Sequence, residues 1–140
     1  MKTVQSRFGP LECDSVLTLN FPEGLIGFEE LHEFIVMPQR ETGAWFWIQS
    51  TEDKDVAFIL TDPSKFFFDY SVSPDPQERR KLGIEAQDDC FALAVATIHH
   101  DKSVTLNLAA PILYAPKSCQ AIQVILEGAP YHTRTPLPKS

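Results

Sequence analysis

The sequence predicts a mainly β protein, a single compact domain of barrel-like or sandwich form with one or two short helices. Apolar runs of about four to eight residues recur along the chain and end at proline or glycine, which is typical of short strands in β-sandwiches and barrels. The chain has 140 residues, and 44% of them are hydrophobic, including 10 Phe. This length and composition fit one domain over residues 1–140 with an adequate core, and they exclude a largely disordered chain.

Seven runs are expected as strands, at residues 16–21, 34–37, 44–48, 56–60, 91–98, 104–108 and 121–126. Several of these runs carry apolar residues at both alternating positions, which indicates strands that lie between two apolar layers. The tail from Thr135, which contains Pro136 and Pro138, is expected to fray.

One short helix is predicted after Asp75. Asp75 is a preferred N-cap residue, Pro76 suits the first helical position, and Glu78 at the third position completes a capping box. Gly83 can adopt the left-handed conformation that ends a helix, and the basic residues 79–81 before it suit the negative end of the helix dipole. A second helical turn is expected around residues 28–32.

The composition excludes several classes of protein. The chain has 19 Asp and Glu against 12 Lys and Arg, a formal net charge of −7, so direct binding to nucleic-acid phosphates is not expected. The longest apolar stretch, residues 90–98, is about half of a membrane-spanning helix, and the first residues contain no apolar leader, so neither membrane insertion nor secretion is expected. The 3 Cys show no C-x-x-C spacing, which indicates reduced thiols in a cytoplasmic protein rather than a disulfide framework or a zinc site.

The carboxylates cluster in two stretches that contain no Lys or Arg. The first, residues 8–39, holds Glu12, Asp14, Glu23, Glu29, Glu30 and Glu33, and the second holds Glu85, Asp88 and Asp89. A charge run is usually a solvated face, but two unneutralised stretches in a small domain also suit a basic protein partner. Both interpretations remain open.

Residues 21–28 combine large apolar side chains with turn formers. One interpretation is a buried loop that closes the end of a barrel, with Gly24 and Gly27 at positive φ. The other is an apolar rim presented to a partner, with the ring of Phe28 as an anchor. The candidate partner-binding residues are therefore Glu23, Phe28, Glu29, Glu30, Glu33, Asp88 and Asp89.

His99, His100 and Asp101 are residue types that serve metal or acid–base chemistry. Adjacent residues of a strand point to opposite faces, so the two histidines are poorly placed to bind one ion, and a solvated hairpin turn explains all three residues. No catalytic or metal-binding residue is assigned. A small metal-dependent or histidine-based β-barrel enzyme that uses these residues is the alternative to a binding protein.

Four blocks stand out in order along the chain: residues 21–29 (FPEGLIGFE), residues 47–70 with WIQS, Asp53 and AFILTDP, residues 105–112 (TLNLAAPI), and residues 123–134 with QVIL, Tyr131 and Arg134. In order and spacing, over residues 2–137, they resemble the F-x-x-G-L-P-G-F-E loop, the central block, the T-x-N-L-x-A-P-I signature and the closing strand of the bacterial flagellar assembly factor FliW family. Ile26 stands where the family usually has proline, which implies a looser turn. Motif residues expected to be structural are Phe21, Gly24, Gly27, Asp62, Pro63, Asn107 and Pro111.

The resemblance implies a monomeric, barrel-like, cytoplasmic protein without enzymatic activity or cofactor. It also implies two alternative protein partners: flagellin, held by its terminal helical region before export, and CsrA, a small homodimeric mRNA-binding regulator. The resemblance further implies that the protein, once freed by flagellin export, binds CsrA and lowers the affinity of CsrA for the flagellin message, so that translation resumes. A flagellin-export chaperone that has no CsrA partner is a second alternative.

Overall fold

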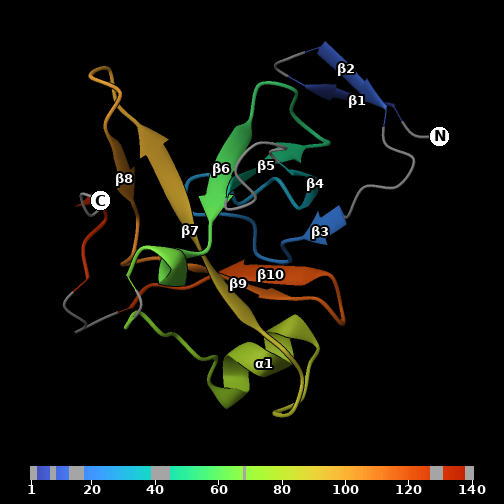
Figure 1. Cartoon of the computed structure of the whole chain (residues 1–140). Coiled ribbons are helices and arrows are strands. Elements are labelled where there is room, and N and C mark those ends of the chain that lie inside the picture. Colours follow the sequence, from blue (N-terminus) through green and yellow to red (C-terminus); the bar gives the residue numbers. More distant parts are fainter. Residues whose placement is uncertain are drawn as a thin grey trace.

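The computed structural model describes residues 3–6, 9–12, 18–38, 45–67, 69–126 and 131–137. Its strands are β1 Thr3–Ser6, β2 Gly9–Glu12, β3 Thr18–Asn20, β4 Glu33–Pro38, β5 Trp45–Ser50, β6 Ala57–Thr61, β7 Phe91–Ile98, β8 Val104–Leu106, β9 Ile112–Ala115, β10 Gln120–Gln123 and β11 Thr135–Pro136, and its helices are the short 3-10 helix η1 Pro63–Lys65 and the α-helix α1 Pro76–Leu82. The β1–β2 hairpin forms a sheet of its own, and the remaining strands form one larger sheet (Figure 1).

In the larger sheet, strands β3 to β7, β9 and β10 close into a 7-stranded barrel, which confirms the mainly β, barrel-like prediction. The closure depends on β7, which pairs with β9 through residues 91–93 and with β6 through residues 94–96. A second seam joins β10 to β3 in parallel at the pair Gln120 and Asn20. There the backbone N–H of Asn20 also donates to the carbonyl of Cys119 at 2.9 Å.

The barrel strands send alternate side chains inward and outward, and both sets are apolar. On β9, Ile112 packs into the barrel core with Phe21 and Phe34, whereas the next residue, Leu113, packs outside against Leu82 of α1. Strands β6 and β7 alternate in the same way between the barrel core and an outer apolar cluster. This confirms the prediction that these strands lie between two apolar layers.

Helix α1 covers the outer face of β9 and β10, below the barrel in Figure 1. The Asp75 carboxylate accepts from the Glu78 N–H at 2.7 Å, and the Glu78 carboxylate accepts from the Asp75 N–H at 2.9 Å. Gly83 ends the helix with a φ of 70°. The predicted helix is therefore confirmed, with its capping box and its glycine C-cap.

The prediction of a second helical turn around residues 28–32 is wrong. The Leu31 N–H donates to the Phe28 carbonyl at 3.1 Å, but this turn does not continue into a helix. The second short helix is η1, where the Asp62 carboxylate caps the Ser64 N–H at 2.9 Å and Pro63 stands in the first turn. Strand β9 is not among the expected strands, although residues 112–115 form a short apolar run between Pro111 and Pro116.

Of the tail that is expected to fray from Thr135, residues 135–137 lie against the sheet, and residues 138–140, which include Pro138, lie outside the described residues. Strand β11 pairs with β8 at Leu106 and Thr105. The Tyr131 ring packs edge-on against Tyr70, with ring centroids 4.7 Å apart, and Leu137 joins the same outer cluster. These apolar contacts hold a segment whose prolines alone indicated fraying.

The pH dependence of stability tests the burial of Tyr70, whose side chain is 5% exposed and whose hydroxyl donates to the Leu108 carbonyl at 2.8 Å. Burial, with a smaller contribution from Tyr131, raises the pKa of Tyr70 from 10.0 to about 12. Between these values the folded state keeps a proton that the unfolded state releases, so the free energy of unfolding falls as the pH rises through this window.

We expect Tyr70→Phe to lower the free energy of unfolding by about 1–3 kcal/mol at neutral pH, because the Leu108 carbonyl loses its hydrogen-bond donor. We also expect this variant to lose less stability than the wild type between pH 10 and pH 12. Urea unfolding of the wild type and the variant at several pH values measures both effects. Equal alkaline losses for wild type and Tyr70→Phe would contradict this account.

Candidate partner-binding surface

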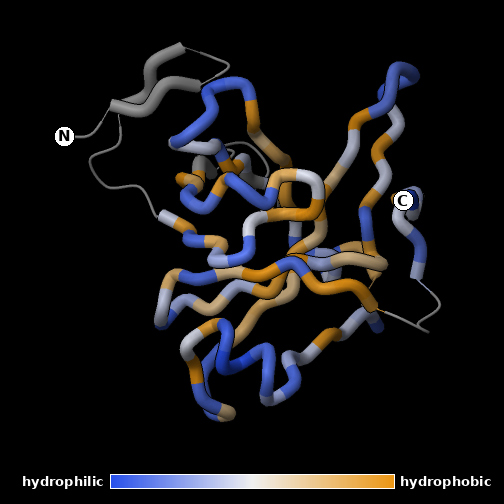
Figure 2. The backbone as a smooth tube through the Cα atoms, turned by 180° about the vertical axis from the view of Figure 1, so that it is seen from behind, coloured by the Kyte–Doolittle hydropathy of each residue, from blue (hydrophilic) through white to orange (hydrophobic). Residues whose placement is uncertain are grey.

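The loop between β3 and β4, residues 21–32, covers the barrel core. Phe21 is fully buried and packs edge-on against Phe34 with ring centroids 5.3 Å apart, and Leu25 is 3% exposed in the same core. Figure 2, which views the protein from behind, shows the loop in front of the barrel, where a hydrophobic stretch passes into a hydrophilic one. The loop therefore closes the core with one part of its sequence and faces outward with another.

A tight turn at residues 25–28 forms the outward part. The Phe28 N–H donates to the Leu25 carbonyl at 2.7 Å, and Gly27 has a φ of 87°, as the third residue of a type II turn requires. Ile26 occupies the second position, and its N–H donates to the Gln123 side-chain oxygen at 2.9 Å. Ile26 is therefore not loosely held, and its anchor to Gln123 is one that proline, which lacks an N–H, could not make.

Gly24 allows the two arms of the loop to come together. Its φ is 69°, and a Cβ at this position would lie 2.4 Å from the Cα of Glu29. The close approach therefore requires glycine and sets the direction in which residues 28–30 leave the turn.

Beside the turn lies a hollow of about 530 Å³, lined by Gly27, Phe28, Glu29, Glu30, Leu31 and Asp53 (the acidic hollow). The Phe28 side chain is 39% exposed, and its ring packs edge-on against Phe58 with ring centroids 5.3 Å apart. Glu29, Glu30 and Asp53 are exposed. An apolar ring next to carboxylates suits a partner segment that is both apolar and cationic.

A buried glutamine fixes the β5–β6 loop, which brings Asp53 to the hollow. Gln49 is fully buried, and its side-chain amide donates to the carbonyls of Ser50 at 3.0 Å and Val56 at 3.1 Å. The same nitrogen lies 3.4 Å from the Asp53 carbonyl. The loop is thus organised from within by a side chain.

Glu52 ties this loop to the start of β4. One carboxylate oxygen of Glu52 accepts from the backbone N–H groups of His32 and Glu33, each at 2.8 Å. These two hydrogen bonds, that of Glu33 first, lower the pKa of Glu52 because they favour its charged form. Local sequence patterns do not indicate the roles of Gln49 and Glu52, because these roles depend on contacts between separate segments.

The remaining predicted carboxylates lie elsewhere, and several are paired. Glu23 lies 3.3 Å from the Lys81 ammonium of α1, and Asp88 lies 3.4 Å from that of Lys117. Asp88 also accepts from the Glu85 N–H, which is the main cause of its lowered pKa. The sequence predicts two unneutralised acidic stretches, but each stretch contains a carboxylate that is paired with a lysine.

Four further predicted carboxylates lie outside the acidic hollow or outside the described residues. Glu33 accepts from the Thr51 hydroxyl at 2.8 Å, and Asp89 is exposed outside the acidic hollow. The side chain of Glu12 and all of Asp14 lie outside the described residues. Of the seven predicted partner-binding residues, Phe28, Glu29 and Glu30 line the acidic hollow.

Asn107 and Pro111 shape the connection between β8 and β9. The Asn107 side-chain oxygen accepts from the Ala110 N–H at 3.1 Å, a contact that suits the structural role expected of this motif residue. Pro111 is buried, and its carbonyl accepts from the Val124 N–H at 3.0 Å. Both residues thereby hold the chain as it re-enters the barrel.

His99, His100 and Asp101, the residues that the alternative enzyme hypothesis would use, lie in the turn of the β7–β8 hairpin. His99 Nε2 lies 2.8 Å from the Thr105 hydroxyl, and the Asp101 carboxylate accepts from the hydroxyl and N–H of Ser103 at 2.6 Å and 2.9 Å. The Ser103 bonds lower the pKa of Asp101. Within the described ranges, no group of three or more potential ligands could hold a metal ion, and no helix is long and apolar enough to cross a membrane.

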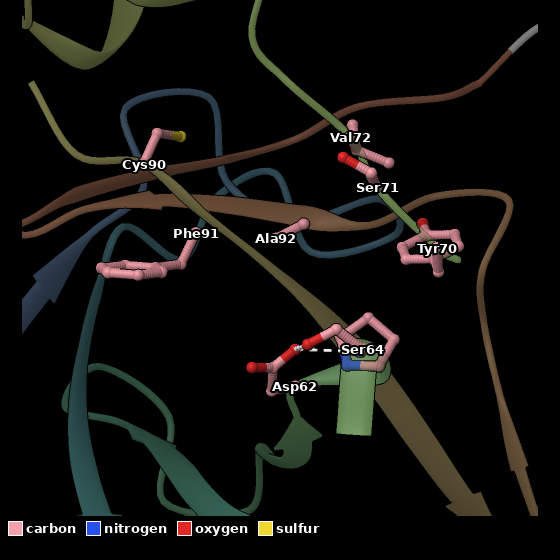
Figure 3. A pocket seen from close by; sticks show the side chains of 9 residues that line it. Asp62, Ser64, Tyr70, Ser71, Val72, Cys90, Phe91 and Ala92 are labelled. Atoms are coloured by element: carbon pink, nitrogen blue, oxygen red, sulfur yellow. Dashed lines mark hydrogen bonds between the residues drawn. The ribbon is translucent and has the colours of Figure 1, made fainter. Parts of the chain in front are cut away.

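A smaller hollow of about 170 Å³ lies between η1 and the start of β7 (Figure 3). Residues 90–92 form one of its walls, and the Asp62 carboxylate, which also lines it, accepts from the Ser64 hydroxyl. Burial, followed by the charge of Glu78, raises the pKa of the Cys90 thiol. The Cys90 thiol is therefore harder to ionise than an ordinary cysteine, the opposite of what activates a cysteine nucleophile.

Comparison with known proteins identifies the family. The family model described as FliW protein matches residues 2–137. The chain is 58% identical over 137 residues to the flagellar assembly factor FliW of Syntrophotalea carbinolica, with 98% of each chain covered. It is 49% identical over 138 residues to flagellar assembly factor FliW 2 of Desulfotalea psychrophila, with 99% of this chain and 91% of that protein covered. The chain belongs to the FliW family of flagellar assembly factors.

The fold agrees with this assignment. A crystal structure of the flagellar assembly factor FliW matches with a TM-score of 0.86 at 25% identity, and the match covers 99% of this chain and 98% of that one. Gln49 and Asp53, which shape the β5–β6 loop, lie in the block that resembles the central block of FliW. The resemblance of this block to the family is therefore the feature of the sequence that could have indicated these two residues.

Two glycine substitutions test the geometry of the loop. Gly27→Ala should lower the free energy of unfolding by about 1–2 kcal/mol, because the positive φ of this residue is unfavourable for alanine. The loss should be limited to this amount, because a Cβ at this position meets nothing within 4 Å. Gly24→Ala should cost more, because its Cβ would also collide with the backbone of Glu29. Urea unfolding of both variants measures the difference, and equal losses would argue against the close approach at Gly24.

Proposed function

We propose that this chain is a non-catalytic protein-binding switch of the cytoplasm. It binds flagellin and, when it is free of flagellin, binds and antagonises a CsrA-type translational regulator, so that flagellin mRNA is translated. Membership of the FliW family supports the flagellar role. The main observation that supports a cationic protein partner is the acidic hollow, where carboxylates lie beside the ring of Phe28.

The charge of the two proteins supports this pairing. A regulator that holds RNA must be cationic where it contacts phosphates, and this chain has a net charge of −7. Exposed carboxylates at Glu29, Glu30 and Asp53 attract such a surface before contact, whereas the Phe28 ring supplies apolar area after contact. The binding need not cover the RNA site, since a coupling of about 1–3 kcal/mol changes RNA affinity by about 5- to 150-fold.

Affinity purification from a native flagellated cell, with mass spectrometry of the bound proteins, tests the proposal. Recovery of both flagellin and the regulator, in separate complexes with a monomeric chain, is the expected result. Recovery of flagellin alone would support the flagellin-export chaperone instead. Recovery of neither protein would contradict the proposed function.

Charge reversal tests the acidic hollow directly. We expect Glu29→Lys and Glu30→Lys to slow association with the purified regulator more than they speed dissociation, because exposed charges act mainly on encounter. Asp69→Lys, an exposed reversal outside the hollow, is the matched control, and Asp89→Lys tests the second acidic stretch. Stopped-flow or surface-binding kinetics provide the rates.

The same kinetics should depend on salt. Attraction between exposed charges is screened beyond about 8–10 Å near physiological ionic strength, so the wild-type association rate should fall as salt rises. This salt dependence should be weaker in Glu29→Lys than in Asp69→Lys. An association rate that stays constant from low to high salt would count against an electrostatic encounter surface.

A further inference from the structure

A narrow crevice opens between the loop and the barrel wall, next to the acidic hollow. It has a volume of about 200 Å³ and is lined by Leu25, Ile26, Phe58, Val95, Asn107 and Gln123 (the crevice). The edge-on contact between Phe28, which lines the acidic hollow, and Phe58, which lines the crevice, joins the two depressions. The crevice and the hollow therefore lie next to each other at this aromatic pair.

The lining of the crevice is apolar except for two amides. Both ends of the Gln123 side chain are occupied, because its oxygen accepts from the Ile26 N–H at 2.9 Å and its nitrogen donates to the Ala110 carbonyl at 3.0 Å. The Asn107 oxygen accepts from the Ala110 N–H, but its side-chain nitrogen has no hydrogen-bond partner in the described part of the chain. The crevice therefore combines an apolar wall with one available donor.

We propose that the crevice receives one large apolar side chain of the cationic regulator, while the Asn107 side-chain N–H donates to a main-chain carbonyl beside that residue. Lysine or arginine residues flanking the apolar residue would then reach Glu29 and Glu30 in the acidic hollow. This inference rests on the proposed function and adds the anchor that charge alone does not supply. An apolar cavity of about 150 Å³ already accepts benzene, so the crevice is large enough for a leucine or phenylalanine side chain.

Charge complementarity selects this occupant. The carboxylates beside the crevice make an apolar residue among cations more favourable than one in a neutral or acidic segment. At the rim, Ile26 is 52% exposed, so a side chain entering the crevice would cover apolar surface that is now in water. The Gln123 anchor holds Ile26 in place before binding, which limits the ordering cost of association.

The test uses the wild-type chain with two purified probes, the regulator homodimer and flagellin. Asn107→Asp keeps the oxygen that accepts from Ala110 but removes the free donor, so the protein should fold normally. We expect it to speed dissociation of the regulator by at least about tenfold; dissociation is measured because the added charge acts on association. Asn107→Ala, which also removes the acceptor, reports the structural part of the role through its melting temperature.

A second pair of variants tests the apolar anchor. Ile26→Ser keeps the N–H that Gln123 accepts and should weaken binding of the regulator about threefold to tenfold. Ile98→Ser, at a residue that is 59% exposed on the β7–β8 hairpin, is the matched control and should bind as the wild type does.

The outcomes separate the two proposals. If the wild type does not bind the regulator, the proposed function fails. If the wild type binds it and both Asn107→Asp and Ile26→Ser bind equally well, the crevice proposal alone is overturned. If these two variants lose only flagellin binding, or if sedimentation shows that they change self-association, the crevice has another occupant. Either result would also overturn the crevice proposal.

Discussion

The pairing of β7 on both of its edges is the constraint on which the rest of the structure depends. By joining β6 and β9 it closes the barrel, so the backbone groups of these strands are satisfied within the sheet. β7 also separates two apolar clusters, with Leu93 and Val95 on the barrel side and Ala94 and Ala96 on the outer side. A shift of one residue would exchange these sets, placing alanines in the barrel and large side chains in the outer cluster.

The candidate surface depends on this frame through side-chain contacts at several levels. The barrel core holds Phe21 and Leu25, and the Leu25 carbonyl accepts from the Phe28 N–H, which closes the turn that presents Ile26 and Phe28. The neighbouring β5–β6 loop is fixed from inside by Gln49 and from outside by Glu52 (the hydrogen bonds to the start of β4). A surface held in this way loses little conformational freedom on binding, so more of its contact energy remains available for affinity.

Features that depend on nearby residues could be predicted from the sequence. Helix α1 is specified by Asp75, Glu78 and Gly83, which are all within nine positions of one another along the chain, and β7 is specified by a bounded apolar run. The positive φ values of Gly24 and Gly27 also follow from the turn chemistry of the loop. In each case the deciding interaction lies between residues that are close in sequence.

Features that depend on long-range contacts could not be predicted. The ion pairs of Glu23 with Lys81 and of Asp88 with Lys117 join separate parts of the chain, so the acidic runs alone gave a misleading picture of free charge. Asp53 reaches the acidic hollow only because Gln49 and Glu52 shape its loop. Strand β11, with two residues, is too short to show any periodicity, and its place on β8 depends on the packing of nearby aromatic and aliphatic side chains.

The seam between β3 and β10 has a consequence for the order in which the protein can fold. It joins residue 20 to residue 120 through one parallel pair, so this contact forms only after residue 120 has left the ribosome. Contacts of such long sequence separation are slow to form, and the loop that they close carries a large entropic cost. During synthesis, the hairpins from β4 to β6 can pair early, while the barrel stays open and its inner faces remain exposed until the last strands arrive.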